Sequence, residues 1–300
     1  AKDFFDTGIT WSNSLNVAQM LDKSSYSISL GNTHQDGIIS STGMDRYNVK
    51  VSADTKLTNN WSSGFTANYI TTSIDKAVTS GNGLLRTVYA APPSYDLAGI
   101  PSHVDGNPYT QNSFRGSFDN AYWAMDNNKF TEDTNRFFGN VYASYQTDFG
   151  TTNHKLNAKY MVGVDAYTTH YVDSYGYGSN TGGGRGQIEN YGWTNATYNS
   201  LLTINYDWRI NEDWGLNAVL GNEIIQSNRK KYYEYGTNYN FPGWNHINNA
   251  TTQQTEEETW KNRTVGFFGN VSASYKNMLY LTLTGRQDYV SNMPRNNRSF

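Results

Sequence analysis

Apolar and polar residues alternate along most of this chain with a period of two. In residues 154–172, for example, Leu156, Tyr160 and Val162 fall on one face and Asn157 and Lys159 on the other. Successive side chains of a β-strand point to opposite faces, so this pattern predicts a strand with one apolar and one polar face. About ten such stretches follow one another, with very little helical sequence between them. They cover residues 11–20, 25–30, 46–57, 61–73, 135–149, 154–172, 196–208, 214–224, 263–275 and 279–286.

One nine-residue segment occurs twice, at residues 137–145 and 267–275, and the copies differ only where Tyr142 is replaced by Ser272. Many of the predicted strands exceed the usual length of about 5–6 residues. A tilted strand crosses a membrane in about 9–11 residues. We therefore interpret the apolar faces as contacting lipid and the polar faces as lining a wet or plugged interior. The residues predicted to point inward are Asn48, Lys50, Ser52, Asp54, Asn157, Lys159, Asp165, Asn217 and Glu223.

The connections between these stretches alternate between short and long. The short ones are residues 21–24, 58–60, 150–153, 211–213 and 277–278. The long ones are residues 31–45, 74–134, 173–192 and 226–262. In a meander of strands this order places every long connection at the same end. Outer-membrane barrels have short periplasmic turns and long extracellular loops, whereas a β-sandwich or a propeller has no reason to keep such an order.

Aromatic residues lie next to the short turns, at Trp61, Phe149, Trp208, Trp214 and Tyr275. An aromatic girdle at the periplasmic interface predicts this position, whereas ordinary core aromatics would explain each residue but not the shared position. Hydrophobic residues make up only 37% of the 300 residues, and no run of 18 apolar residues exists, so no transmembrane helix is expected. A barrel needs apolar residues only at alternate positions. The sequence therefore predicts an all-β fold, an antiparallel transmembrane β-barrel.

The remaining composition excludes several kinds of chemistry. A net charge of −3 gives no reason to expect nucleic-acid binding, and the absence of cysteine excludes disulfides and thiolate chemistry. The five histidines show no metal-ligand spacing, so we expect no metal, no cofactor and no catalytic residue. The glycine-rich residues 182–186 lack the strand–helix context of a phosphate loop and predict a loop tip. The acidic residues 256–258 are interpreted as a solvated loop.

Several segments resemble SusC-like (RagA/SusC family) TonB-dependent transporters in collinear order. Residues 22–31, 35–39 and 45–49 read DKSSYSISLG, QDGII and DRYNV, and are similar to the family's first barrel strands, approximately "sYyiSlgy…qeGii…yeRynvr". The further matching segments are FDNAYW at 118–123, NNKF at 127–130, NRFFGN at 135–140, and 268–275 with 279–281 and Arg286. After Asp288 the family usually has Gly, but this chain has Tyr289.

This resemblance implies a barrel of about 22 strands filled by an N-terminal plug. Members of the family import oligosaccharides, or in some branches oligopeptides, across the outer membrane of Gram-negative, Bacteroidota-type bacteria. A SusD-like surface lipoprotein covers the extracellular face, and TonB–ExbB–ExbD supplies energy through the plug region. We expect residues 1–300 to be one portion of that barrel, cut at both ends, without the plug and the C-terminal strands. The residues before Phe300 do not alternate as a terminal barrel strand would.

Aromatic and amide residues crowd the long connections, and aromatic faces with amides suit a sugar or a peptide backbone. Mutual packing of these side chains, or packing on a plug or lid protein, is the competing explanation for each one. Phe114 and Tyr109 are further aromatics of the longest connection. The candidate substrate-binding residues are Tyr122, Trp123, Tyr175, Tyr177, Trp193, Tyr235, Tyr239, Trp244 and Asn245.

Two other functions remain open from the sequence. One is an all-β surface or secreted binding protein, such as an adhesin, with its apolar faces packed inside and no transport role. The other is an outer-membrane barrel enzyme such as a lipase, for which His170 is the candidate to mutate. The sequence does not identify the solute, the cognate lipoprotein or the oligomeric state.

Overall fold

The computed structural model describes residues 2–78, 84–113, 115–294 and 298, so that Phe114 and Phe300 lie outside the described residues. Its main feature is one ten-stranded sheet in which every neighbouring pair is antiparallel, in the order β1-β2-β3-β4-β7-β8-β9-β10-β11-β12. The strands are β1 (Thr10–Met20), β2 (Ser24–Asp36), β3 (Gly43–Lys56), β4 (Trp61–Asp75), β7 (Lys129–Thr147), β8 (His154–Tyr175), β9 (Gln187–Arg209), β10 (Trp214–Tyr239), β11 (Ala250–Tyr275) and β12 (Leu279–Val290).

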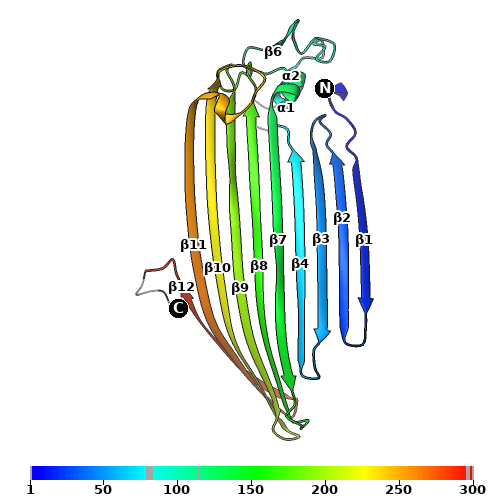
Figure 1. Ribbon diagram of the computed structural model, residues 1–300, viewed down its shortest axis with the longest axis vertical. Helices are drawn as coiled ribbons and strands as arrows, with labels where there is room; N and C mark the ends of the chain where they lie inside the picture. Colours follow the sequence, from blue (N-terminus) through cyan, green and yellow to red (C-terminus); the bar gives the residue numbers. More distant parts are fainter. Residues whose placement is uncertain (1, 79–83, 114, 295–297, 299–300) are drawn as a thin grey trace.

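The predicted meander and its two unlike ends are confirmed. Figure 1 shows the tight turns at one end of the strands and the long connections, with the helices, gathered at the other. The long connections carry α1 (Leu84–Ala90), β5 (His103–Val104), β6 (Asn107–Gln111), α2 (Ala121–Asn127) and η2 (Ile247–Asn249), and η1 (Lys2–Phe4) precedes β1 at the same end. In the described part of the chain, no helix has both the length and the apolar composition needed to cross a membrane. Among the described residues β1 and β12 are the two edges of the sheet, which is therefore an open part of a barrel.

One face of the sheet is apolar and exposed over all ten strands. The cross-strand register places the apolar residues of neighbouring strands opposite one another, as in Val141 against Val162 and Phe65. Val162 is 42% exposed, Val141 53% and Leu220 63%, values that in water would leave a large apolar surface wet. Asn222 also lies on this face, where its amide donates a 3.0 Å hydrogen bond to the backbone oxygen of Gly266. This band is the face assigned to lipid by the sequence pattern.

The apolar band ends before the long strands do, as β10 shows. In β10 the outward positions are apolar from Leu216 to Ile224, apart from Asn222, and then become Gln226, Asn228 and Lys230. Above that level the outward face is no longer apolar, so alternation of apolar and polar residues no longer marks the strand. The sequence therefore predicted the strands too short and the loops too long. The predicted connection 226–262 shrinks to residues 240–249, and the acidic run 256–258 belongs to β11 instead of a loop.

The buried hydrophobic clusters lie at the long end of the strands. The main cluster contains Leu84 and Val88 of α1 and Trp123 of α2, together with Phe4 and Leu97. A second cluster joins Ile188, Tyr239 and Ala250 at the upper ends of β9, β10 and β11. The long connections are thus a packed cap at one end of the strands.

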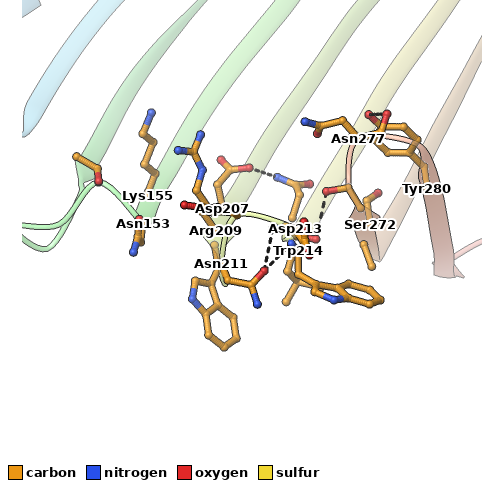
Figure 2. A pocket seen from close by; sticks show the side chains of 18 residues that line it. Asn153, Lys155, Asp207, Arg209, Asn211, Asp213, Trp214, Ser272, Asn277 and Tyr280 are labelled. Carbon is orange, nitrogen blue, oxygen red and sulfur yellow. Dashed lines mark hydrogen bonds between the residues drawn. The ribbon is translucent and has the colours of Figure 1, made fainter.

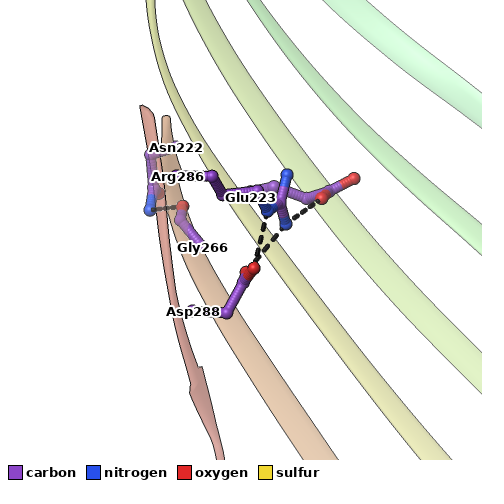
Figure 3. Close-up of polar contacts among 5 residues, drawn as sticks. All are labelled: Asn222, Glu223, Gly266, Arg286 and Asp288. Carbon is purple, nitrogen blue, oxygen red and sulfur yellow. Dashed lines mark hydrogen bonds and ion pairs between the residues drawn. The ribbon is translucent and has the colours of Figure 1, made fainter. Parts of the chain in front are cut away.

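The inward face is polar, and all nine residues predicted to point inward share it in the cross-strand register. Side chains from strands two apart meet there over a glycine of the strand between them. Figure 3 shows Arg286 of β12 crossing β11 to Glu223 of β10 at 2.8 Å, while it also binds Asp288 at 2.7 Å. Gly266 lies between Glu223 and Asp288 in the register, and a Cβ there would contact Arg286 and Asp288.

The same arrangement joins β3 to β7 over Gly64 of β4. The Tyr142 hydroxyl donates a 2.6 Å hydrogen bond to Asp54 Oδ1, and the two residues flank Gly64 in the register. A Cβ at Gly64 would approach both Asp54 and Tyr142, as well as the oxygen of Ala53. Glycine at this position therefore permits a contact that spans three strands.

We expect Gly64→Val to destabilise the folded barrel by about 1–3 kcal/mol, because the added side chain displaces Tyr142 and Asp54 and overpacks the site. The measurement is the urea midpoint of the full-length protein in detergent, followed by the heat-dependent shift of folded barrels on gels. Gly285→Val is the matched control, since a Cβ at Gly285 meets nothing within 4 Å. Equal midpoints for the two variants would refute the three-strand contact.

Candidate functional site

An aromatic cluster lies on the inward face above the apolar band. The rings of Tyr171 and Tyr191 stack at 4.7 Å with an interplanar angle of 6°. Trp193 meets both rings edge-on, at 5.6 and 6.1 Å. Alternation along β9 puts Tyr191 and Trp193 on one face, and the register places Tyr171 of β8 directly opposite Tyr191. The result is a surface of three aromatic side chains on two neighbouring strands.

Charged groups surround this cluster. The ammonium of Lys76 lies 4.6 Å from the centre of the Tyr171 ring and 3.4 Å from Glu132 Oε2. The Tyr191 hydroxyl donates a 3.1 Å hydrogen bond to Asp173 Oδ2. Burial first, and then the charge of Asp173, raises the pKa of Tyr191 above its usual value. The hydroxyl is therefore a protonated donor at neutral pH, as the contact with a carboxylate requires.

A buried carboxylate holds two of the long connections together. Asp119 is 7% exposed, and its carboxylate accepts four hydrogen bonds. The donors are Gln111 Nε2 at 2.8 Å, the backbone N of Asn180 at 2.7 Å, Asn180 Nδ2 at 2.8 Å and Ser179 Oγ at 2.5 Å. Four donors compensate the cost of burying the charge, because buried charges need such partners. Asp119 thus fixes the connection between β8 and β9 against the segment that precedes α2.

The structure distributes the nine predicted site residues over several environments. Trp123 and Tyr239 are 0% exposed, and Trp123 donates from Nε1 to the oxygen of Pro108 at 2.8 Å. Burial raises the pKa of Tyr239 to about 12. Tyr177 packs against the cluster that contains Tyr239. These three side chains therefore pack inside the cap of long connections.

The remaining predicted residues are more accessible. Tyr122 of α2 lines a cavity of about 410 Å³ with Tyr95 and Asp96. Trp244 stacks on Phe241 and His246, and Asn245 donates to the oxygen of Asn127 at 2.8 Å. Tyr175, Trp193 and Tyr235 lie in strands β8, β9 and β10 and not in loops as predicted, and they share the inward face. Their role as solute contacts stays a prediction.

Two inward residues near Trp193 were not among the candidates, namely Arg229 of β10 and Trp260 of β11. The Arg229 guanidinium lies 5.4 Å from the Trp193 ring and 5.5 Å from the Trp260 ring. Arg229 and Trp260 could not be selected from the sequence, because residues 226–262 were interpreted as a loop, in which the direction of a side chain is not predicted. Continuing the strand period upward from Ile224 would have placed both on the inward face.

A polar hollow of about 710 Å³ lies at the opposite, short-turn end of the sheet (Figure 2). Its inward side chains form a hydrogen-bonded chain in which Asn217 donates to Asp207 at 2.6 Å and to Asn205 at 2.8 Å. Lys155 and Tyr280 also line it. The hollow contains none of the nine predicted substrate-binding residues.

Among the described residues, no three His, Cys, Asp or Glu side chains are grouped so as to hold a metal ion. His170 stacks on Tyr232 at 5.8 Å, and its Nδ1 shares a hydrogen bond with the Tyr232 hydroxyl. Gly192 lies between the two in the register. This contact therefore joins β8 to β10 across a glycine of β9.

Comparison with known proteins gives a consistent picture. No family model matches the chain. TonB-dependent receptor P3 of Formosa agariphila is 23% identical in an alignment that covers 99% of this chain and 30% of that receptor. The RagAB peptide importer in its open-open state superposes with a TM-score of 0.79 at 16% identity, over 100% of this chain and 33% of the matched one. The chain resembles part of a SusC/RagA-like TonB-dependent transporter.

A more distant structure shares the same kind of barrel. The ferripyoverdine receptor of Pseudomonas aeruginosa matches with a TM-score of 0.51 at 13% identity, over 95% of this chain and 36% of the receptor. The chain thus spans about a third of the length of the proteins it matches. The aromatic cluster and Arg229 lie on the polar, inward face of the sheet, above the level at which the apolar residues of β10 end.

Proposed function

We propose that this chain is a portion of an outer-membrane barrel that imports a nutrient by TonB-dependent transport. The observation that carries the proposal is the apolar band, which runs over all ten strands on one face while the other face is largely polar. A sheet with this distribution of side chains is suited to lipid on one side and a wet interior on the other. The long connections then face the extracellular side of a Gram-negative, Bacteroidota-type cell.

The solute and the partners follow from the same proposal. The similarity to the RagAB peptide importer supports a surface lipoprotein of the SusD type as a partner, seated over the cap of long connections. Energy comes from TonB–ExbB–ExbD through an N-terminal plug region of the whole protein. The solute is an oligosaccharide or an oligopeptide, and the inward aromatic and amide side chains are its contacts. The barrel carries out no covalent chemistry on it.

The test is purification of the full-length protein from outer membranes in mild detergent, followed by mass spectrometry of everything that co-elutes. We expect a lipoprotein partner together with bound glycan or bound peptides, and the bound molecules identify the solute class. Recovery of the protein in the soluble fraction without a partner would reject the proposal. It would instead support a surface or secreted all-β binding protein, whose apolar faces are covered by protein.

A further inference from the structure

The inward wall above the apolar band contains an arginine held between two tryptophans. Arg229 lies on β10 three residues above Gln226, where the outward face has already become polar. In the register it pairs with Asn195 on β9 and with Trp260 on β11. Trp193 lies diagonally from it on β9, so that the guanidinium has one indole on each side, at 5.4 and 5.5 Å.

Two aromatic flanks restrict both the position and the hydration of this cation. A guanidinium is planar and weakly hydrated, and it stacks on indole rings through its faces. Its N–H groups point outward from the edge of the plane, where they match the two oxygens of a carboxylate or a sulfate. Flanked in this way, Arg229 has a restricted set of orientations before any ligand arrives, which lowers the entropic cost of binding.

The charge of Arg229 is not neutralised by a nearby side chain. Among the described residues no carboxylate lies within 4.0 Å of it, whereas two other inward arginines hold carboxylates tightly. Arg136 binds Asp165 through two hydrogen bonds of 2.9 and 2.6 Å. The adjacent acid on β11, Glu258, is paired with Lys231 at 3.8 Å. The guanidinium of Arg136 therefore links neighbouring strands through Asp165, whereas the N–H groups of Arg229 can bind a ligand.

We propose that Arg229, with Trp193 and Trp260, is a subsite for an oxyanion carried by the imported solute, and that the solute is an acidic oligosaccharide. This inference rests on the proposed function. The stacked rings of Tyr171 and Tyr191 continue the aromatic surface beyond Trp193. Pyranose rings pack on such surfaces, while a carboxylate or sulfate on the same chain pairs with the guanidinium.

The test measures binding to the full-length transporter, with its partner lipoprotein, by calorimetry in detergent. The probes are tetragalacturonate and its methyl ester, which has the same rings without the charge. We expect the acid to bind at least about tenfold more tightly than the ester, as expected for a charge-assisted pair. Arg229→Gln should abolish this preference, because loss of the guanidinium weakens binding of the acid far more than binding of the ester. Arg229→Lys keeps the charge without the planar edge and recovers only part of the preference.

Arg46→Gln is the control, because Arg46 lies on the inward face of β3 and has no ring contact or ion pair among the described residues. Equal loss in Arg46→Gln and Arg229→Gln would overturn the subsite, since only general charge would then matter. A tetrapeptide with a free or an amidated C-terminus tests the other source of a carboxylate. Arg229-dependent binding of the free peptide and not of the galacturonate would overturn the saccharide assignment.

Failure of the subsite and failure of the proposed function give different results. If the protein co-purifies from outer membranes with its lipoprotein and with a neutral solute, and Arg229→Gln binds that solute normally, only the subsite is wrong. If the protein is absent from outer membranes, the proposed function is wrong and the subsite falls with it. The heat-dependent gel shift verifies that each variant is folded before binding is measured.

Discussion

Val162→Arg is expected to prevent assembly of the protein into the outer membrane. Val162 lies in the apolar band, opposite Val141 and Ser200. A charged side chain on the lipid face near the middle of a bilayer costs about 2–4 kcal/mol, which is a large part of the stability of a folded protein. The measurement is the amount of folded, heat-modifiable protein in outer-membrane fractions.

Two inward substitutions on the same strand serve as controls. Met161 is the next residue along β8, at nearly the same depth, and the register places it on the polar face. Asn157 lies on that face nearer the short turns. Met161→Arg and Asn157→Arg should both assemble, because their side chains reach a wet interior. Equal yields for all three variants would show that the apolar face is not the lipid face.

Asp119→Ala is expected to release the connection between β8 and β9 from the cap. The substitution leaves the donors of Gln111, Ser179 and Asn180 without their acceptor in a buried setting. Hydrogen bonds to a charged group contribute about 1.5–3 kcal/mol each, so the local loss is about 3 kcal/mol or more. Hydrogen–deuterium exchange of the full-length protein should show faster exchange at residues 176–186, while the strands stay protected.

Asp105→Ala provides the comparison, because Asp105 is an exposed acid in the turn between β5 and β6. Its exchange pattern should match that of the unsubstituted protein throughout the cap. Asp119→Asn keeps the shape and one carbonyl acceptor, and should fall between the two. Unchanged protection at residues 176–186 in Asp119→Ala would mean that other contacts hold the cap together.

The parts of the fold that face two different environments could be predicted from the sequence. Where lipid lies on one side and a wet interior on the other, alternation is imposed on every strand, and Val141, Val162 and Leu220 reveal it. The short turns could also be predicted, because only a few residues separate the alternating stretches that they join. Two of them are also strained into the left-handed region, at Phe149 and at Lys276 with Asn277.

The upper parts of the strands could not be predicted, because their outward face is no longer apolar. From Ala250 to Arg263 the outward and inward positions of β11 carry the same kinds of residue, so the period of two leaves no mark on the sequence. The side-chain directions in the candidate site could not be predicted for the same reason. Trp193 was selected for its residue type alone, whereas Arg229 and Trp260 become part of a site only once the register brings three strands together.

Because the strands extend beyond the apolar band, the backbone of the upper wall is fixed independently of the side chains that the wall presents. A wall made of paired strands keeps its backbone fixed by main-chain hydrogen bonds, whatever side chains it carries. Every second residue of that wall faces inward, and it can be exchanged without disturbing the pairing that holds its neighbours. Single inward positions, such as those of Trp193 and Arg229, can therefore change the chemistry of the polar face while the strands and the cap keep their form.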